Sequence, residues 1–236
     1  MRKKKWWIPE LVSKPPRRGR PEGSAAGIQL ESTMTRDILT ANVERSIEVH
    51  GRLLSSCLGA MTAAADALVA AYNAGRKAIF FGNGGSAADA QHLAAEFVGR
   101  YLRERSPLPA LALNANSSAV TAISNDYGYA EVFARQLQAL AVAGDVAVGI
   151  STSGNSPNVI QALRAARKLG LSTIGLTGSS GGAMRNEVDV LIAAPTDETP
   201  RIQECHILIG HALCDAVEQA ITTAPAVSSG KGSRER

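Results

Sequence analysis

The chain has 236 residues, of which 45% are hydrophobic and 19% charged, and this composition excludes intrinsic disorder for most of its length. The formal net charge is +4, but residues 1–20 carry eight Lys or Arg against one Glu, and residues 21–229 have a net charge of −5. Duplex recognition needs a basic folded surface, and a membrane span needs ~18 consecutive apolar residues. We therefore expect neither a nucleic-acid partner nor a membrane partner.

The cysteines and the N-terminus indicate a cytoplasmic protein. Cys57, Cys205 and Cys214 are odd in number and show no C-x-x-C spacing, so they predict neither a disulfide framework nor a thiolate zinc site. The basic N-terminus lacks the apolar run of a secretory signal.

The two ends of the chain differ from its body. Residues 1–33 are rich in Pro, Gly and Arg and show no apolar periodicity, which predicts a disordered basic extension. From about Thr35 to Asn73 the apolar residues are spaced for one or two amphipathic helices. Residues 225–236 predict a flexible tail, so we expect one folded domain over residues 34–224.

Strand and helix patterns alternate after the first helices. Predicted strands cover residues 77–81, 108–113, 145–150, 171–176 and 188–193. Predicted helices cover residues 86–100, 118–124, 130–142, 157–169 and 200–221. Such alternation indicates a parallel sheet with helices on both faces. The expected fold is a three-layer α/β/α sandwich with a five-stranded parallel sheet, preceded by N-terminal helices.

A Gly-rich turn follows the first predicted strand. Its sequence, GNGGSA at residues 82–87, matches the GxGxxG/A fingerprint of dinucleotide-binding proteins. That class also needs an Asp or Glu at the end of the second strand for the ribose hydroxyls. Residues 113–116 are Leu-Asn-Ala-Asn, so the sequence disfavours a nicotinamide cofactor.

A second polar turn, STSGNS at residues 151–156, lies between the third strand and a helix that begins at Pro157. Four hydroxyl groups and free N–H groups at a helix N-terminus suit a phosphate monoester, because the helix dipole favours an anion. No lysine follows, as a nucleoside triphosphate site would require. The alternative is a turn with a simple N-cap, a role that Ser and Asn serve well.

Two predicted helices carry polar side chains suited to chemistry. His92 and Glu96 are four residues apart and share one helix face, where they could hold a metal, pair as acid and base, or form an ordinary surface pair. Gln203 and His211 are eight residues apart in the last helix and could converge on an ion between them. His206 competes with His211, and spacing alone does not choose between them.

The segments GNGGSAADAQH (82–92) and STSGNS (151–156) resemble the sugar isomerase (SIS) domain family, and more narrowly its sedoheptulose 7-phosphate isomerases. The segments NDYGY (125–129) and RIQE (201–204) match as well, and the resemblance runs from about residue 35 to 221. It implies a flavodoxin-like SIS fold and a homotetramer with sites built near subunit contacts. The implied substrate is a phosphorylated seven-carbon sugar.

The resemblance implies an aldose–ketose isomerase. The reaction would convert D-sedoheptulose 7-phosphate to D-glycero-D-manno-heptose 7-phosphate by proton transfer through an enediol, as the first step of activated heptose biosynthesis. Glu96 and His211 would transfer the protons, and one zinc ion per subunit would be held by His92, Glu96, Gln203 and His211. The implied substrate contacts are Asn83, Gly84, Gly85, Ser86, Glu96, Asn125, Asp126, Ser151, Thr152, Ser153, Ser156 and Gln203.

Two other functions compete with this interpretation. A non-catalytic SIS-domain regulator that binds a replication-initiator protein shares the segments SAADAQH and ALCD, but retention of both Glu96 and His211 favours the enzyme. An aminosugar-phosphate isomerase or a sugar-sensing regulator would lack the His92, Gln203 and His211 set. His50 matches no motif, and we expect it to be a surface helix residue.

Overall fold

The computed structural model describes residues 25–223, with side chains from Thr33 onward. The predicted tail and the first 24 residues of the predicted extension lie outside the described residues. Helix α1 (Ala25–Ser56) includes residues 25–33, which the sequence pattern placed in the extension; their Ala, Gln, Leu and Glu residues are good helix formers despite the missing periodicity. Among the described residues, those up to Val43 form a unit of their own, and the α/β domain begins at Glu44.

The predicted order of strands and helices is confirmed. The helices are α2 (Leu58–Asn73), α3 (Gly85–Val98), α4 (Ser117–Tyr127), α5 (Val132–Leu140), α6 (Pro157–Lys168) and α7 (Thr199–Thr223), with 3-10 turns η1 (Tyr129–Glu131) and η2 (Ala183–Asn186). The strands are β1 (Ala78–Gly82), β2 (Ala110–Ala112), β3 (Val146–Ile150), β4 (Ser172–Thr177) and β5 (Val190–Ala193). Strand β2 is shorter than the predicted 108–113, and it begins after Pro109, which has no N–H for the ladder.

The five strands form one parallel sheet in the order β2-β1-β3-β4-β5. This is the flavodoxin-like order, in which the chain changes direction along the sheet between β1 and β3. All five residues of β1 and of β3 are buried, as expected for strands covered on both faces. The last residues of these two strands, Gly82 and Ile150, are direct partners.

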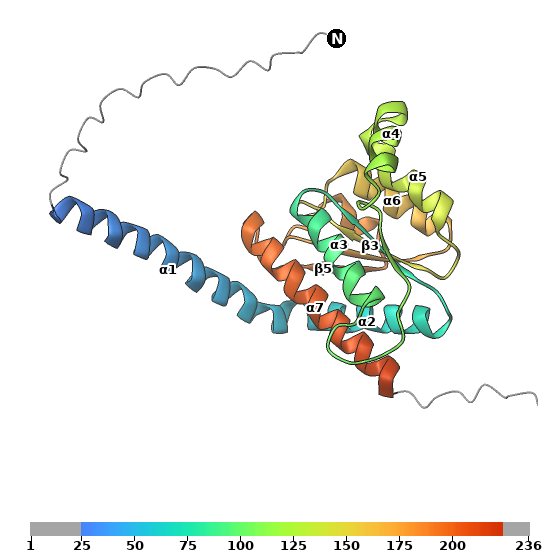
Figure 1. Ribbon diagram of the computed structural model, residues 1–236, viewed down its shortest axis with the longest axis horizontal. Coiled ribbons are helices and arrows are strands. Elements are labelled where there is room, and N and C mark those ends of the chain that lie inside the picture. Colours follow the sequence, from blue (N-terminus) through green and yellow to red (C-terminus); the bar gives the residue numbers. More distant parts are fainter. Residues whose placement is uncertain (1–24, 224–236) are drawn as a thin grey trace, which may run out of the picture. The chain divides into compact units, whose positions relative to one another are not determined.

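Helices cover both faces of the sheet (Figure 1), and a hydrophobic core lies on each face. Ala78 and Phe80 of β1 face the core formed with α2, α3 and α7. Ile79 and Phe81 point the other way, into the core formed with α5 and α6. The alternation follows from the two-residue period of a strand and confirms the three-layer sandwich.

Helices α1 and α2 meet at Cys57 with a bend of 69°. In the described part of the chain, no single helix is both long and apolar enough to cross a membrane; α1 from Thr33 and α2 meet that criterion only as a bent pair. Leu53 and Met61 pack into the domain's own core, whereas Leu54 and Leu58 are exposed.

Candidate active site

The two Gly-rich turns leave the sheet side by side. Because Gly82 and Ile150 are partners, the turns that follow them start at adjacent strand ends. Helix α3 begins at Gly85 and α6 at Pro157, so each turn leads directly into a helix N-terminus. In open α/β sheets this crevice, at the carboxyl ends of strands where the strand order reverses, is where ligands bind.

Three hydroxyl groups gather in the turn after β3. Ser151 Oγ lies 2.9 Å from Ser156 Oγ and 3.5 Å from Ser153 Oγ. Ser156 is the N-cap residue of α6, yet among the described residues its side chain makes no capping hydrogen bond. Ser156 therefore does not act as the simple N-cap considered from the sequence. Its hydroxyl instead joins a cluster at the positive end of the helix.

The same turn is fixed by its backbone. Gly154 has a φ of +65°, and a Cβ there would collide with the carbonyl group of Gly181. The N–H of Met184 donates to Gly154 O at 2.9 Å, and the N–H of Ala183 donates to Asn155 Oδ1 at 2.9 Å. The turn is thus preformed rather than shaped by a ligand.

Asn83 joins the two turns. Its side-chain amide exchanges two 2.9 Å hydrogen bonds with the amide of Asn158, a buried residue in the first turn of α6. Tyr129 Oη also donates to Asn83 Oδ1 at 2.9 Å. Through these bonds the Asn83 side chain links the turn after β1 to the N-terminus of α6. Nothing in the sequence pattern pointed to Asn158, and the matching NDYGY segment was the only signal for Tyr129.

Gln203 lies against the turn after β1. A Cβ placed on Gly85 would approach Gln203 Nε2 to 2.5 Å, so any larger residue there would displace this amide. Gln203 is half-buried on the first turns of α7. The structure therefore brings it to the predicted substrate turn.

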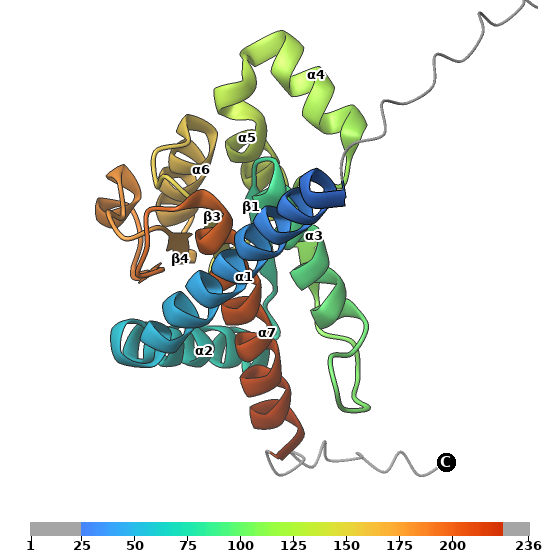
Figure 2. The same ribbon diagram turned by 90° about the vertical axis from the view of Figure 1, so that its left-hand side faces the viewer.

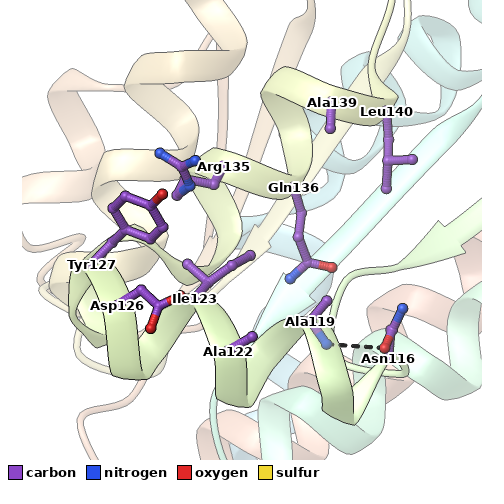
Figure 3. Close-up of a pocket in the computed structure, with 10 residues that line it drawn as sticks. All are labelled: Asn116, Ala119, Ala122, Ile123, Asp126, Tyr127, Arg135, Gln136, Ala139 and Leu140. Carbon is purple, nitrogen blue, oxygen red and sulfur yellow. Dashed lines mark hydrogen bonds between the residues drawn. The ribbon is translucent and has the colours of Figure 1, made fainter.

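Asn125 and Asp126 lie on α4 rather than in either turn. Both are exposed near the end of α4, where Asn125 Nδ2 donates to Asp126 Oδ1 at 2.8 Å. Helix α4 buries none of its own residues and packs against α5 and η1. Figure 2 shows it next to α5. Asp126 lines a cavity of about 470 Å³ between α4 and α5, where the guanidinium of Arg135 lies 3.6 Å above the ring of Tyr127 (Figure 3).

A second group of site residues lies between α3 and α7. His92 Nε2 is 2.8 Å from His211 Nε2 and 3.5 Å from Glu96 Oε1. Side chains of His92 and Glu96 are 45% and 22% exposed, so the group is open to a ligand. We call His92, Glu96 and His211 the helix cluster. The structure thus brings together both predicted proton-transfer residues and three of the four predicted metal ligands.

The donor types of the helix cluster suit zinc, which takes imidazole nitrogen and carboxylate oxygen. In the described residues, however, no group of three His, Cys, Asp or Glu side chains is arranged to hold a metal ion. Two nitrogens on one tetrahedral zinc lie about 3.3 Å apart, whereas the His92–His211 separation of 2.8 Å is a hydrogen-bond distance. Gln203 precedes His211 by eight residues of α7, about 12 Å of helix.

The other two histidines have different surroundings. His206 is fully buried, its Nε2 lies 3.2 Å from the carbonyl oxygen of Thr177, and burial lowers its pKa to about 4. It is a neutral core residue, and the structure places His211 rather than His206 beside His92. His50 is half-buried, with Nδ1 2.8 Å from the carbonyl oxygen of Ser46, so it is less exposed than expected.

Comparisons with known proteins bear on the family and the fold. Residues 44–178 match the SIS domain family. A phosphoheptose isomerase of Rhodospirillum rubrum is 54% identical over 168 residues, which cover 71% of this chain and 89% of that protein. The structure is similar to a phosphoheptose isomerase from Neisseria gonorrhoeae, with a TM-score of 0.75 and 42% identity over 78% of this chain and 99% of that one. It is also similar to one from Francisella tularensis, with a TM-score of 0.76 and 37% identity over 78% of this chain and 98% of that one.

Proposed function

The chain belongs to the SIS domain family and to its phosphoheptose isomerases, and we propose that it converts D-sedoheptulose 7-phosphate to D-glycero-D-manno-heptose 7-phosphate. The observation that carries the proposal is the helix cluster, because it joins a carboxylate and two imidazoles on the two helices that begin at the substrate turn. The alternative of a non-catalytic regulator is not supported: curated relatives that are 54% and 50% identical are phosphoheptose isomerases.

The turn after β3 supplies the phosphate site in this proposal. The hydroxyl groups of Ser151, Ser153 and Ser156 donate to the phosphate at the positive end of α6. Thr152 lies in the same turn. The sugar hydroxyls then face Gly84, Gly85, Ser86 and Gln203 across the crevice.

The helix cluster supplies the proton transfers. A ketose becomes an aldose when a base moves a proton from C1 to C2 and the hydroxyl proton moves from O1 to O2. Glu96 removes the proton from C1 and returns it to C2, and His211 moves the proton between the two oxygens. His92 contacts both residues and holds them on one side of the paired helices.

A zinc ion, one per subunit, fits the donor types of the helix cluster. The family resemblance implies that His92, Glu96, Gln203 and His211 would hold it; to do so, the 2.8 Å His92–His211 contact would have to open, and Gln203 would have to reach the ion from about 12 Å along α7. When bound, the ion would polarise the sugar oxygens and so stabilise the developing negative charge.

We propose a homotetramer as the active form, as the family resemblance implies. Eleven residues separate Gly85 from Glu96, which is about 16 Å of helix. Seven carbons joined by bonds of about 1.5 Å span at most about 9 Å. The carbon chain alone is therefore shorter than this separation, and we propose that the helix cluster of another copy faces a sugar anchored at the turns. Exposed Leu54 and Leu58 give apolar surface for such contacts.

We also propose a cytoplasmic location. The three cysteines are unpaired and buried, as is usual in a reducing compartment.

The direct test is turnover. The full chain, separated by size and weighed by light scattering, is incubated with D-sedoheptulose 7-phosphate, and formation of the aldose is followed by NMR. We expect the tetramer fraction to form the aldose, a chelator to stop it and zinc to restore it. Absence of aldose from a folded, zinc-supplied tetramer would contradict the proposed function.

A further inference from the structure

A buried ion pair lies beyond the helix cluster and closes the end of α3. Arg105 Nε is 3.0 Å from Glu218 Oε1, and their side chains are only 4% and 1% exposed. The guanidinium of Arg105 also donates to the carbonyl oxygens of Glu96 and Phe97, each at 2.9 Å. These are among the last carbonyls of α3, which have no partner within the helix. Arg105 thus caps the helix that carries His92 and Glu96.

Glu218 fixes the segment between α3 and Arg105. Its carboxylate accepts the backbone N–H groups of Tyr101, Leu102 and Arg103 at 2.9, 2.7 and 2.7 Å. Burial alone would raise the pKa of Glu218, but these donors and Arg105 hold it below its ordinary value, so the carboxylate stays charged. Glu218 lies on α7, seven residues or two turns after His211.

Tyr101 extends from this fixed segment onto His211. The two rings are stacked, with centroids 5.5 Å apart and planes at 29°. The His92 ring meets the same imidazole edge-on, with centroids 5.0 Å apart. His211 is therefore bounded by Tyr101 and by His92, and the backbone of Tyr101 is held by the helix that carries His211.

We propose that Tyr101 is a positioning residue for the isomerase reaction, because its ring fixes the imidazole of His211 opposite His92 and Glu96. The inference rests on the proposed function. A histidine on a helix surface has free side-chain torsions, and a stacked ring restricts them. Misplacing a reacting group by about 1 Å can cost about 10²-fold in rate, so the ring acts on the catalytic step more than on substrate binding.

The first test separates kcat from KM. Tyr101→Leu removes the ring and keeps apolar bulk, and we expect kcat to fall about ten- to hundred-fold with KM within about twofold of the parent. Tyr101→Phe keeps the ring and should retain the parent kcat. The control is Leu102→Ala in the same segment, whose side chain is 63% exposed. If Tyr101→Leu does not fold, Tyr101→Met replaces it.

A second readout does not depend on activity. Diethyl pyrocarbonate modifies accessible neutral imidazoles, and peptide mass spectrometry follows each histidine separately. In chelator-treated protein we expect Tyr101→Leu to speed modification of His211 severalfold and to leave His50 unchanged. Unchanged kcat in a folded Tyr101→Leu, or an equal loss in Tyr101→Phe, would overturn the proposal. If the parent chain forms no aldose, the proposed function fails, and the modification rates alone decide whether Tyr101 holds His211.

Discussion

The strand-end turns and the helix cluster are built in different ways. The turns are held by main-chain hydrogen bonds, by Gly154 in a left-handed conformation and by the Asn83–Asn158 amide pair. The helix cluster consists of side chains that meet across two helices and depend on the Arg105–Glu218 pair behind them. Backbone geometry therefore prepares binding, whereas the chemistry depends on side-chain contacts that one substitution can remove.

Glu96→Gln breaks the chemical side of this comparison most strongly. The amide keeps the size of the side chain but is not a base, and loss of a general base costs about 10²–10⁴-fold in rate. We expect kcat to fall by that amount and the affinity for the phosphosugar to stay near that of the parent. Discontinuous assays of aldose formation measure kcat, and calorimetric titration with the sugar phosphate measures the affinity.

Metal analysis of the same variant separates two roles of Glu96. Retained zinc with lost turnover identifies the carboxylate as the base, and lost zinc identifies it as a ligand. Glu104→Gln is the matched control, because Glu104 is 91% exposed and pairs only with Arg100 among the described residues. Near-normal turnover in Glu96→Gln would contradict the assigned mechanism.

Replacement of Ser151, Ser153 and Ser156 by alanine breaks the binding side. Hydrogen bonds to a charged group contribute about 1.5–3 kcal/mol each, although not additively, so we expect affinity to fall by about 10²-fold or more. The unfolding midpoint in urea should change little, because the turn is held by its backbone. Ser55→Ala is the control, since the exposed Ser55 hydroxyl bonds only to the carbonyl of Arg52 in the described residues. Unchanged affinity for the phosphosugar would indicate that the phosphate binds at the turn after β1 instead.

Mixing the two inactive variants tests whether the two regions act across a subunit contact. If the turns of one copy work with the helix cluster of another, random 1:1 mixed tetramers restore both parts in about a quarter of their sites. We therefore expect co-expression of Glu96→Gln with the triple serine variant to recover about a quarter of the parent activity. Each variant alone is the control, and no recovery in verified mixed tetramers would place the complete site within one copy.

The sequence predicts the fold more completely than the site. Alternating patterns are local, so the strands and helices could be found in order, and β2 begins later than predicted because Pro109, just before it, has no N–H for the ladder. Part of the helix cluster could be predicted from the sequence, because His92 and Glu96 are one helical turn apart. Tyr101 and Glu218 could not be predicted from the sequence, since their contacts arise only when α3 and α7 pack together. Neither could spacing separate His206 from His211, because burial distinguishes them.

His206 gives the smallest expected effect and contrasts a core histidine with the helix cluster. Burial lowers its pKa from 6.5 to about 4, and in the described residues its Nδ1 is buried without a hydrogen-bond partner. The folded state therefore disfavours the protonated ring. Its contribution to stability is complete above pH 6.5 and is lost progressively as the pH falls from there towards 4.

Between pH 7 and 5.5 this linkage lowers the free energy of unfolding by about 1 kcal/mol. Urea titrations of the parent and of His206→Gln measure it, because glutamine can still donate to the carbonyl of Thr177 but does not titrate. We expect the variant to lose about 1 kcal/mol less than the parent over that range and to keep most of its turnover at pH 7. An identical pH dependence in the two proteins would mean that His206 is as easily protonated in the fold as in the unfolded chain. A large loss of turnover in His206→Gln would make His206, rather than His211, a candidate for the proton transfer.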